Sequence, residues 1–292
     1  MSEFSPKYGE IEDISTTIRR ITAPNPAPYT YKGTGTYIIG RGDVAIIDPG
    51  PNMPVHIESI IKSLDGENVS HILVTHNHKD HSPAAQPLSE ITGAKIYAYD
   101  PKDQQYLEDD IEEGIDRDFK PHINISDGHI INGSDWTIEA VHTPGHLSNH
   151  LCFAYAEEKA LFTGDHIMGW STTIVSPPDG NMQDYLDSLE KILRRDDEIY
   201  YPTHGKPIED PKMLVQKLID HRLKREKDII EAIEAGADQL QLMVRSIYNN
   251  IPEKLYIAAE RTIYAHLIRL VALGEITCDG VPNEASKYGL NK

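Results

Sequence analysis

The chain has 292 residues, of which 39% are hydrophobic and 25% are charged, as in an ordinary soluble globular protein. Its 28 Lys and Arg against 46 Asp and Glu give a formal net charge of −18, which disfavours a polyanionic partner. The apolar runs are far shorter than the about 20 residues that span a bilayer, so we expect no membrane partner. The polar N-terminus lacks the apolar core of a secretory signal, which predicts a cytoplasmic location.

The two cysteines, Cys152 and Cys278, are far apart and form no CxxC motif. They therefore predict neither a disulfide framework nor a thiolate metal site. The 14 histidines are the more informative residues.

Strands and helices alternate in the first two thirds of the chain. Paired strands are predicted at GTGTYIIG (33–40) and GDVAIIDPG (42–50). A helix over 53–64, with Val55, Ile57, Ile60, Ile61 and Leu64 on one face, and a strand at HILVT (71–75) complete a β-α-β unit. The same pattern continues with strands at 94–100 and 136–143, an acidic stretch at 108–118, a hairpin at 152–165 and a helix at 182–194, and IYYPTHG (199–205) ends this portion. This order predicts a layered α/β domain with a site at one rim.

Helix-forming residues dominate after about residue 209. A helix is predicted from Pro211 to Ala235, ending at Gly236, and a shorter one follows over 237–248. A third begins near Pro252, with Ile257, Ile263, Leu267 and Leu270 facing inward, and leads into a hairpin at Asp279-Gly280. Three helices and a hairpin resemble a winged-helix unit, so we expect two domains, 1–209 and 210–292.

The segment THNHKDH (75–81) carries the strongest chemical signal. His76, His78, Asp80 and His81 fall within six residues, directly after a predicted buried strand. Imidazole and carboxylate groups are ligands for zinc, iron or manganese, and a loop leaving a strand can direct several of them to one point. We therefore predict a metal site.

Three further segments follow apolar strands: HTPGHLSNH (142–150), LFTGDH (161–166) and IYYPTHG (199–205). Each is weak alone. In this order after HxHxDH, they resemble the motifs of the metallo-β-lactamase superfamily over roughly residues 15 to 209. The resemblance implies an αβ/βα sandwich, two mixed sheets flanked by helices, with the metal site at one edge and residues 1–209 as the catalytic domain.

The resemblance also implies a set of metal ligands: His76, His78 and His146 for the first metal, Asp80, His81 and His204 for the second, and Asp165 as the bridge between them. Two Zn²⁺ ions are expected, and Fe or Mn also suits ligands without thiolates. A hydroxide bridging the metals then attacks carbonyl carbon or phosphorus, so Asp80 and Asp165 are expected to act in catalysis.

Two residues are expected to support this centre. The resemblance gives Asp48 the role of propping the ligand loop through hydrogen bonds. His150 is expected to position a substrate oxygen or to donate a proton to the leaving group. A supporting or surface role for His150 stays open as the alternative.

The long loop after Asp165 and the C-terminal module resemble the branch that contains the lactamase-beta-like endoribonuclease of mitochondria and fungal acyl-carrier-protein thioesterases. This implies cleavage of single-stranded RNA or, alternatively, hydrolysis of a small acyl thioester or lactone, as in the more distant glyoxalase II, with β-lactamase activity as a side reaction.

The residues near this loop and module do not decide between the substrates. An apolar acyl group would suit Met168, Trp170, Ile174 and Val175, although packing explains them equally well. RNA would need the basic residues of the long predicted helix, which are Lys212, Lys217, Arg222, Lys224, Arg225 and Lys227.

A third hypothesis is a non-enzymatic regulator that binds DNA through the winged helix. The complete ligand set and the negative charge both oppose it. In an enzyme, such a module shapes a substrate cleft or makes a dimer contact, so a homodimer is a further expectation.

Overall fold

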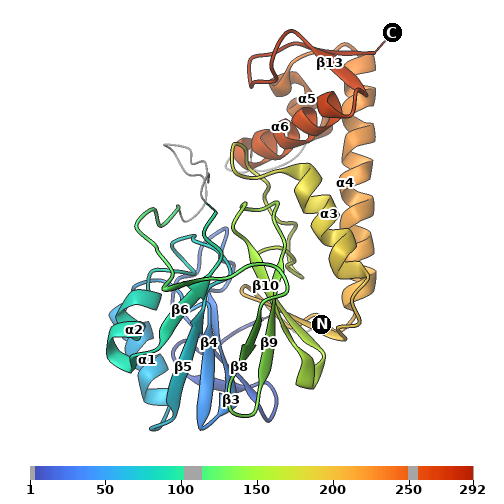
Figure 1. Ribbon diagram of the computed structural model, residues 1–292. Coiled ribbons are helices and arrows are strands. Elements are labelled where there is room, and N and C mark those ends of the chain that lie inside the picture. The colour runs from blue at the N-terminus through green and yellow to red at the C-terminus, as the bar shows by residue number, and fades with distance from the viewer. Residues whose placement is uncertain (1–3, 102–113, 249–255, 292) are drawn as a thin grey trace. The chain divides into compact units, whose positions relative to one another are not determined.

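The structure is a computed structural model that describes residues 4–101, 114–248 and 256–291 (Figure 1). Its chain divides into two compact units. The first comprises Met1–Thr143, Asn149–Thr173 and Arg195–Pro211, and the second comprises Pro144–Ser148, Ile174–Arg194 and Lys212–Lys292. Most of the predicted acidic stretch and the predicted start of the third C-terminal helix lie outside the described residues.

A mixed sheet of seven strands forms one layer of the first unit. In sheet order the strands are β1 (Ile11–Asp13), β2 (Ile18–Thr22), β3 (Gly35–Arg41), β4 (Asp43–Ile47), β5 (Asn68–Leu73), β6 (Lys95–Ala98) and β7 (Ile123–Asn124). Neighbours are antiparallel from β1 to β4 and parallel from β4 to β7. The predicted strand pair is the β3–β4 hairpin.

The helices α1 (Pro54–Ser63) and α2 (Ala85–Thr92) lie beside this sheet in Figure 1. The predicted β-α-β unit is confirmed as β4, α1 and β5. Ile57 and Ile60 pack with Leu64 into an apolar cluster that also holds residues of the sheet. The expectation that Val55 shares this face is wrong, because its side chain is 55% exposed.

A second mixed sheet of five strands forms the other layer. Its order is β12 (Ile199–Pro202), β11 (Ala160–Gly164), β10 (Leu151–Tyr155), β9 (Thr137–His142) and β8 (Ile130–Asn132). β10 and β11 form the predicted hairpin, joined by the short helix η1 (Ala156–Glu158), while β11 and β12 run parallel.

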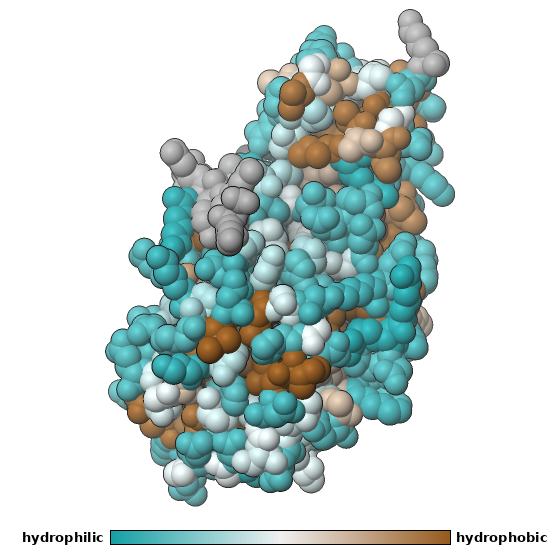
Figure 2. Space-filling model, in the orientation of Figure 1, coloured by the Kyte–Doolittle hydropathy of each residue, from teal (hydrophilic) through white to brown (hydrophobic). Residues whose placement is uncertain are grey.

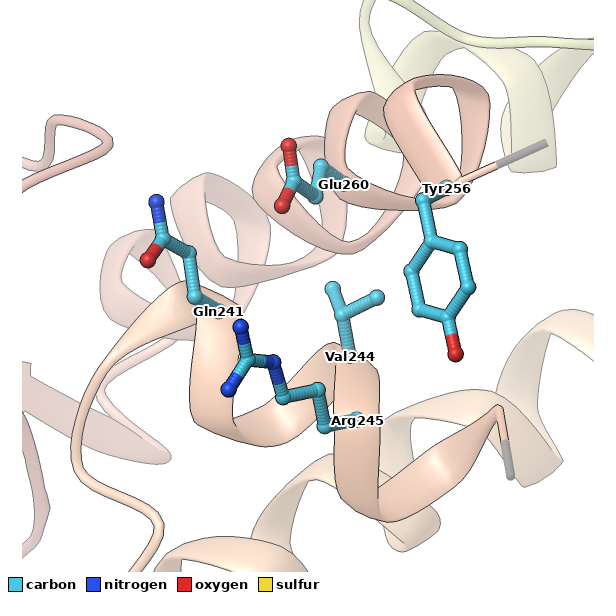
Figure 3. A pocket seen from close by; sticks show the side chains of 5 residues that line it. All are labelled: Gln241, Val244, Arg245, Tyr256 and Glu260. Carbon is cyan, nitrogen blue, oxygen red and sulfur yellow. The ribbon is translucent and has the colours of Figure 1, made fainter. Parts of the chain in front are cut away.

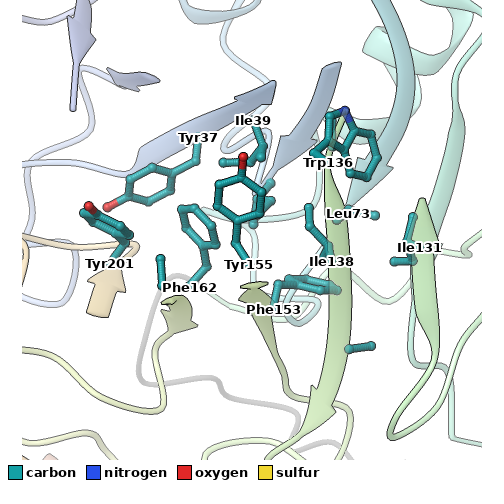
Figure 4. Close-up of a cluster of buried hydrophobic side chains, with 14 of the residues drawn as sticks. Tyr37, Ile39, Leu73, Ile131, Trp136, Ile138, Phe153, Tyr155, Phe162 and Tyr201 are labelled. Carbon is teal, nitrogen blue, oxygen red and sulfur yellow. The ribbon is translucent and has the colours of Figure 1, made fainter. Parts of the chain in front are cut away.

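The two sheets of the first unit enclose an apolar core. Figure 4 shows Tyr37 and Ile39 of β3 directed toward Phe153 and Phe162 of the second sheet. The Tyr37 and Phe162 rings meet edge to face, 4.9 Å apart, and the Tyr37 hydroxyl donates to the Pro202 carbonyl at 2.8 Å. The buried phenol therefore ties the larger sheet to the end of β12, two residues before His204.

The second unit contains α3 (Met182–Leu193), α4 (Pro211–Glu234), α5 (Leu240–Ile247), α6 (Tyr256–Ala272) and the paired strands β13 (Ile276–Cys278) and β14 (Tyr288–Leu290). Ile263, Leu267 and Leu270 are buried in its core as expected, but Ile257 is 56% exposed and that expectation is wrong. Figure 2 shows hydrophobic side chains at the surface in this part of the chain. The exposed large hydrophobic residues of the second unit include Leu242 and Ile257.

α3 packs within the second unit, although the sequence-based boundary at 209/210 assigns it to the first domain. Arg269 of α6 donates to Gln183 of α3 at 2.8 Å, and Arg222 of α4 stacks on the ring of Tyr185. None of the described helices is long and apolar enough to cross a bilayer.

Candidate metal centre

The loop 75–81 leaves the end of β5 and enters the interior of the first unit. His76 and His81 are fully buried, and His78 and Asp80 are 6% and 4% exposed. Nε2 of His76 lies 3.0 Å from Nδ1 of His78. Burial of so many polar groups is costly without partners, so the loop needs specific interactions to hold it.

Asp48, directly after β4, supplies many of these interactions. Its buried carboxylate accepts hydrogen bonds from the backbone N–H and hydroxyl of Thr75 and from the hydroxyl of Thr203. It also lies 2.8 Å from Nδ1 of His81. A φ of 48° places Asp48 in the left-handed region, which Asp tolerates better than most residues. Asp48 therefore holds the loops before His76 and His204 together.

Four residues bring their polar atoms to one point in the first unit. Nε2 of His204 lies 3.0 Å from Oδ2 of Asp80 and 3.4 Å from Oδ1 of Asp165. Nε2 of His81 lies 3.2 Å and 3.6 Å from the same two oxygens. Two groups of these residues could each hold a metal ion, because the ligand atoms within each group lie within 4.8 Å of one another. The groups are Asp80, His81 and His204, and His76, His81 and Asp165.

These atoms fit a divalent cation. Nε2 of His81, Nε2 of His204 and Oδ1 of Asp165 are buried, and apart from the ion-pair contacts within the cluster they have no hydrogen-bond partner among the described residues. Ligands about 2.0–2.2 Å from one tetrahedral ion lie about 3.4 Å from each other, close to the observed separations. The residues present therefore suit a bound metal.

Charge within the cluster is balanced between imidazoles and carboxylates. Burial alone lowers the pKa of His204, but the Asp165 and Asp80 carboxylates raise it to about 10. Burial alone raises the pKa of Asp165, yet His204 and His81 hold it well below its usual range. The cluster therefore favours protonated imidazoles beside ionised carboxylates, and a metal ion bound by these residues would have to displace the imidazole protons.

His146 belongs to the second unit. Its Nδ1 lies 2.8 Å from the carbonyl oxygen of Ile174, which can only accept, so Nδ1 carries the proton. Nε2 then bears the lone pair that a metal ligand requires. The preceding Gly145 has no side chain because a Cβ atom there would lie 2.4 Å from Cα of Tyr185. That His146 binds a metal together with His76 and His78 remains a prediction.

His150 is fully buried in the first unit, and both ring nitrogens contact the protein. Nε2 accepts the backbone N–H of Asp165 at 3.2 Å, and Nδ1 lies 2.9 Å from the Thr143 hydroxyl. This geometry favours a supporting role. Proton donation by His150 to a leaving group stays a prediction.

Sequence reasoning missed two features beside the cluster. The amide of Asn149 donates to the amide oxygen of Asn77 at 2.9 Å, and the rings of Tyr31 and Trp170 stack 4.7 Å apart. Both pairs join residues far apart in sequence, so no local spacing indicates them. Of the apolar loop residues, Met168 and Val175 are buried, which fits packing, whereas Trp170 is partly exposed.

A pocket of about 460 Å³ lies in the second unit between α5 and α6 (Figure 3). Its five lining residues are Gln241, Val244, Arg245, Tyr256 and Glu260. None of them belongs to the His/Asp cluster.

Comparison with known families decides what the cluster belongs to. Residues 31–204 match the family model described as the metallo-beta-lactamase superfamily. The chain belongs to this superfamily. Residues 240–280 match the beta-lactamase associated winged helix domain, which confirms the expected C-terminal module. The metallo-β-lactamase fold and a hydrolase activity are thereby confirmed.

Relatives and solved structures agree with this placement. The chain is 31% identical to the beta-lactamase-like protein 2 homolog of Caenorhabditis elegans, over 91% of this chain and 88% of the relative. It is 33% identical to the atrochrysone carboxyl ACP thioesterase of Aspergillus fumigatus, over 78% of this chain and 69% of the relative. A beta-lactamase domain protein of Burkholderia ambifaria shares the fold, with a TM-score of 0.81 at 19% identity, covering 99% of this chain and 95% of that one.

Proposed function

We propose that the protein is a dinuclear metallohydrolase that cleaves acyl thioesters. The observation that carries the choice of substrate is its 33% identity to a relative named as an acyl-carrier-protein thioesterase. The buried His/Asp cluster supports the hydrolytic part of the proposal, since a metal can activate water there without a protein nucleophile.

In this proposal the metals are zinc and the ligands are those that the motifs imply. Asp80, His81 and His204 would hold one ion, His76, His78 and His146 would hold the other, and Asp165 would be the ligand that the two ions share. Bound zinc lowers the pKa of water toward neutrality and polarises a carbonyl oxygen. Asp48 keeps His81 oriented through Nδ1, which leaves Nε2 for the metal.

The basic residues of α4 support a thioester over RNA. Arg222 is 2% exposed and stacks on Tyr185, while Arg225 lies over the ring of Tyr248 at 4.3 Å. Lys224 and Arg225 both pair with Asp228. Arg222 and Arg225 are therefore engaged in packing, and a net charge of −18 further opposes a polyanion.

A substrate panel tests the proposal directly. Zinc-loaded protein is given acyl thioesters of coenzyme A and of an acyl carrier protein, a homoserine lactone, a β-lactam and single-stranded RNA. We expect thioester cleavage that disappears in Asp165→Asn. Cleavage of RNA without thioester cleavage would move the protein to the ribonuclease function that its motif order also implied.

A further inference from the structure

The dipeptide Asn149–His150 lies directly before β10, with 3% and 0% of the two residues exposed. Each side chain contacts a different loop that carries predicted metal ligands. The next residue, Leu151, donates its backbone N–H to the Thr75 carbonyl at 2.8 Å. Consecutive residues of one strand end thus touch both loops.

His150 reaches the loop that carries Asp165. Because the Asp165 backbone N–H is a donor, Nε2 of His150 must carry a lone pair and Nδ1 the proton. Nδ1 then donates to the Thr143 hydroxyl at 2.9 Å. Both nitrogens are therefore used in holding backbone and scaffold, and the ring is fixed as one neutral tautomer.

Gly164 makes this approach sterically possible. Its φ is +51°, and a Cβ atom there would lie 2.6 Å from Nε2 of His150. A side chain at this position would displace the imidazole or move the backbone that leads into Asp165. The absence of a side chain at Gly164 therefore allows the His150 ring to lie against the backbone of this loop.

Asn149 reaches the other loop. It donates to the amide oxygen of Asn77, which stands between the predicted ligands His76 and His78. Asn77 is 3% exposed, so this hydrogen bond is shielded from water and is costly to break.

We propose that Asn149 and His150 are positioning residues that set the spacing between the loops 75–81 and 164–166 and thereby the affinity for the metals. This inference rests on the proposed metal centre but not on the choice of substrate. Neither residue touches the reacting atoms in this role. They act by holding the backbone at Asp165 and at Asn77.

The test is a zinc titration of metal-free protein against a competing chelator. In His150→Leu the Asp165 N–H loses its acceptor, and we expect zinc affinity to fall about 10–100-fold, the usual effect of removing a partner that orients a ligand. In His150→Gln the side-chain oxygen can accept the same N–H, so most of the affinity should return. We expect the zinc affinity of Asn149→Ala to fall by a similar factor. The zinc affinity of Asn149→Asp should fall likewise, because the Asp side chain cannot donate a hydrogen bond to Asn77.

His266→Leu is the matched control, because His266 is also fully buried but bonds to Glu226 in the second unit. It should lower thermal stability and leave zinc affinity unchanged. The visible spectrum of the cobalt-substituted protein gives a second readout, which should change in His150→Leu and return in His150→Gln.

The outcomes separate the two proposals. Wild-type zinc affinity in both His150→Leu and Asn149→Ala overturns the positioning role while the metal centre stands. Failure of the wild-type protein itself to bind zinc overturns the metal centre and the positioning role together. If His150→Leu does not fold, the Asn149 variants decide, since their affinity must fall without loss of the folded state.

Discussion

The carboxylate of Asp48 accepts a hydrogen bond of 2.7 Å from the hydroxyl of Thr203, a residue 155 positions away in the chain. The same carboxylate contacts Thr75 and His81. One buried anion thus connects the ends of β4, β5 and β12. Its loss should disturb both the fold of the first unit and the orientation of His81.

We expect Asp48→Asn to destabilise the protein by about 2–3 kcal/mol, because hydrogen bonds to a buried charged group are lost. Asn tolerates the left-handed backbone at this position, so the effect reports the lost acceptor and not backbone strain. Urea unfolding of metal-free protein measures it. A change below about 0.5 kcal/mol would show that Asp48 does not support the loops.

Asp165→Asn should abolish hydrolysis and reduce bound zinc from near two ions per chain. The amide keeps the size of the side chain but loses the charge that offsets His81 and His204. Metal analysis by mass spectrometry and a thioester assay measure the two effects. A variant that retains two zinc ions and full turnover would falsify the dinuclear mechanism.

Trp170→Ala should raise KM for thioesters severalfold and change kcat little. Trp170 stacks on Tyr31 and lies against Gly205, the residue after His204, while staying partly exposed. It is therefore well placed to contact an acyl group without touching the metals.

Trp136→Ala is the control for this variant. Trp136 is 2% exposed, and its Nε1 donates to the Asp43 carbonyl, so its loss should cost about 3–5 kcal/mol of stability. Trp170→Ala should lower the free energy of unfolding by clearly less than Trp136→Ala does. Equal KM values for Trp170→Ala and the wild type would remove Trp170 from the substrate site.

Acid should destabilise the second unit through His266. Burial is the main cause that lowers the pKa of this imidazole, to about 4, and Arg222 lowers it further against the opposing effect of Glu226. The unfolded chain then binds the proton first as the pH falls below about 6.5. Stability from this group is complete above pH 6.5 and is lost between about 6.5 and 4.

The loss over this interval is about 3 kcal/mol for a fully buried group. It should be absent from His266→Gln, whose amide does not titrate. Urea unfolding at pH 7, 6 and 5 compares the two proteins. Parallel pH dependences would mean that His266 is not held neutral in the folded protein.

Local patterns predicted much of this structure. The β3–β4 hairpin, the β-α-β unit and the histidine-rich loop 75–81 each depend on residues close together in sequence, and each is present. Exposure was harder to predict. At about 100° per residue, Val55 lies on the opposite side of α1 from the buried Ile57, Ile60 and Leu64. Ile257 likewise lies on the opposite side of α6 from Ile263, Leu267 and Leu270, so both side chains are exposed.

Long-range partners could not be read from one sequence. Nothing local pairs Asn149 with Asn77, Arg222 with Tyr185, or Asp48 with Thr203. From the sequence alone, the basic residues of α4 remain open as a contact for RNA, whereas in the structure two of its arginines lie over aromatic rings. Only the folded chain shows which charged side chains contact other residues of the protein and are therefore not available to a partner.

The parallel pairing of β11 and β12 has a consequence for how the centre tolerates change. Gly164 pairs with Pro202 in the register of β11 and β12. Asp165 and His204 therefore follow the carboxyl ends of two neighbouring parallel strands, which lie about 4.8 Å apart. The separation of these two groups is set by the sheet and not by the chain that connects them. That connection can lengthen, shorten or change its chemistry over evolutionary time while the pair stays in place. New substrates can thus be acquired without rebuilding the catalytic core.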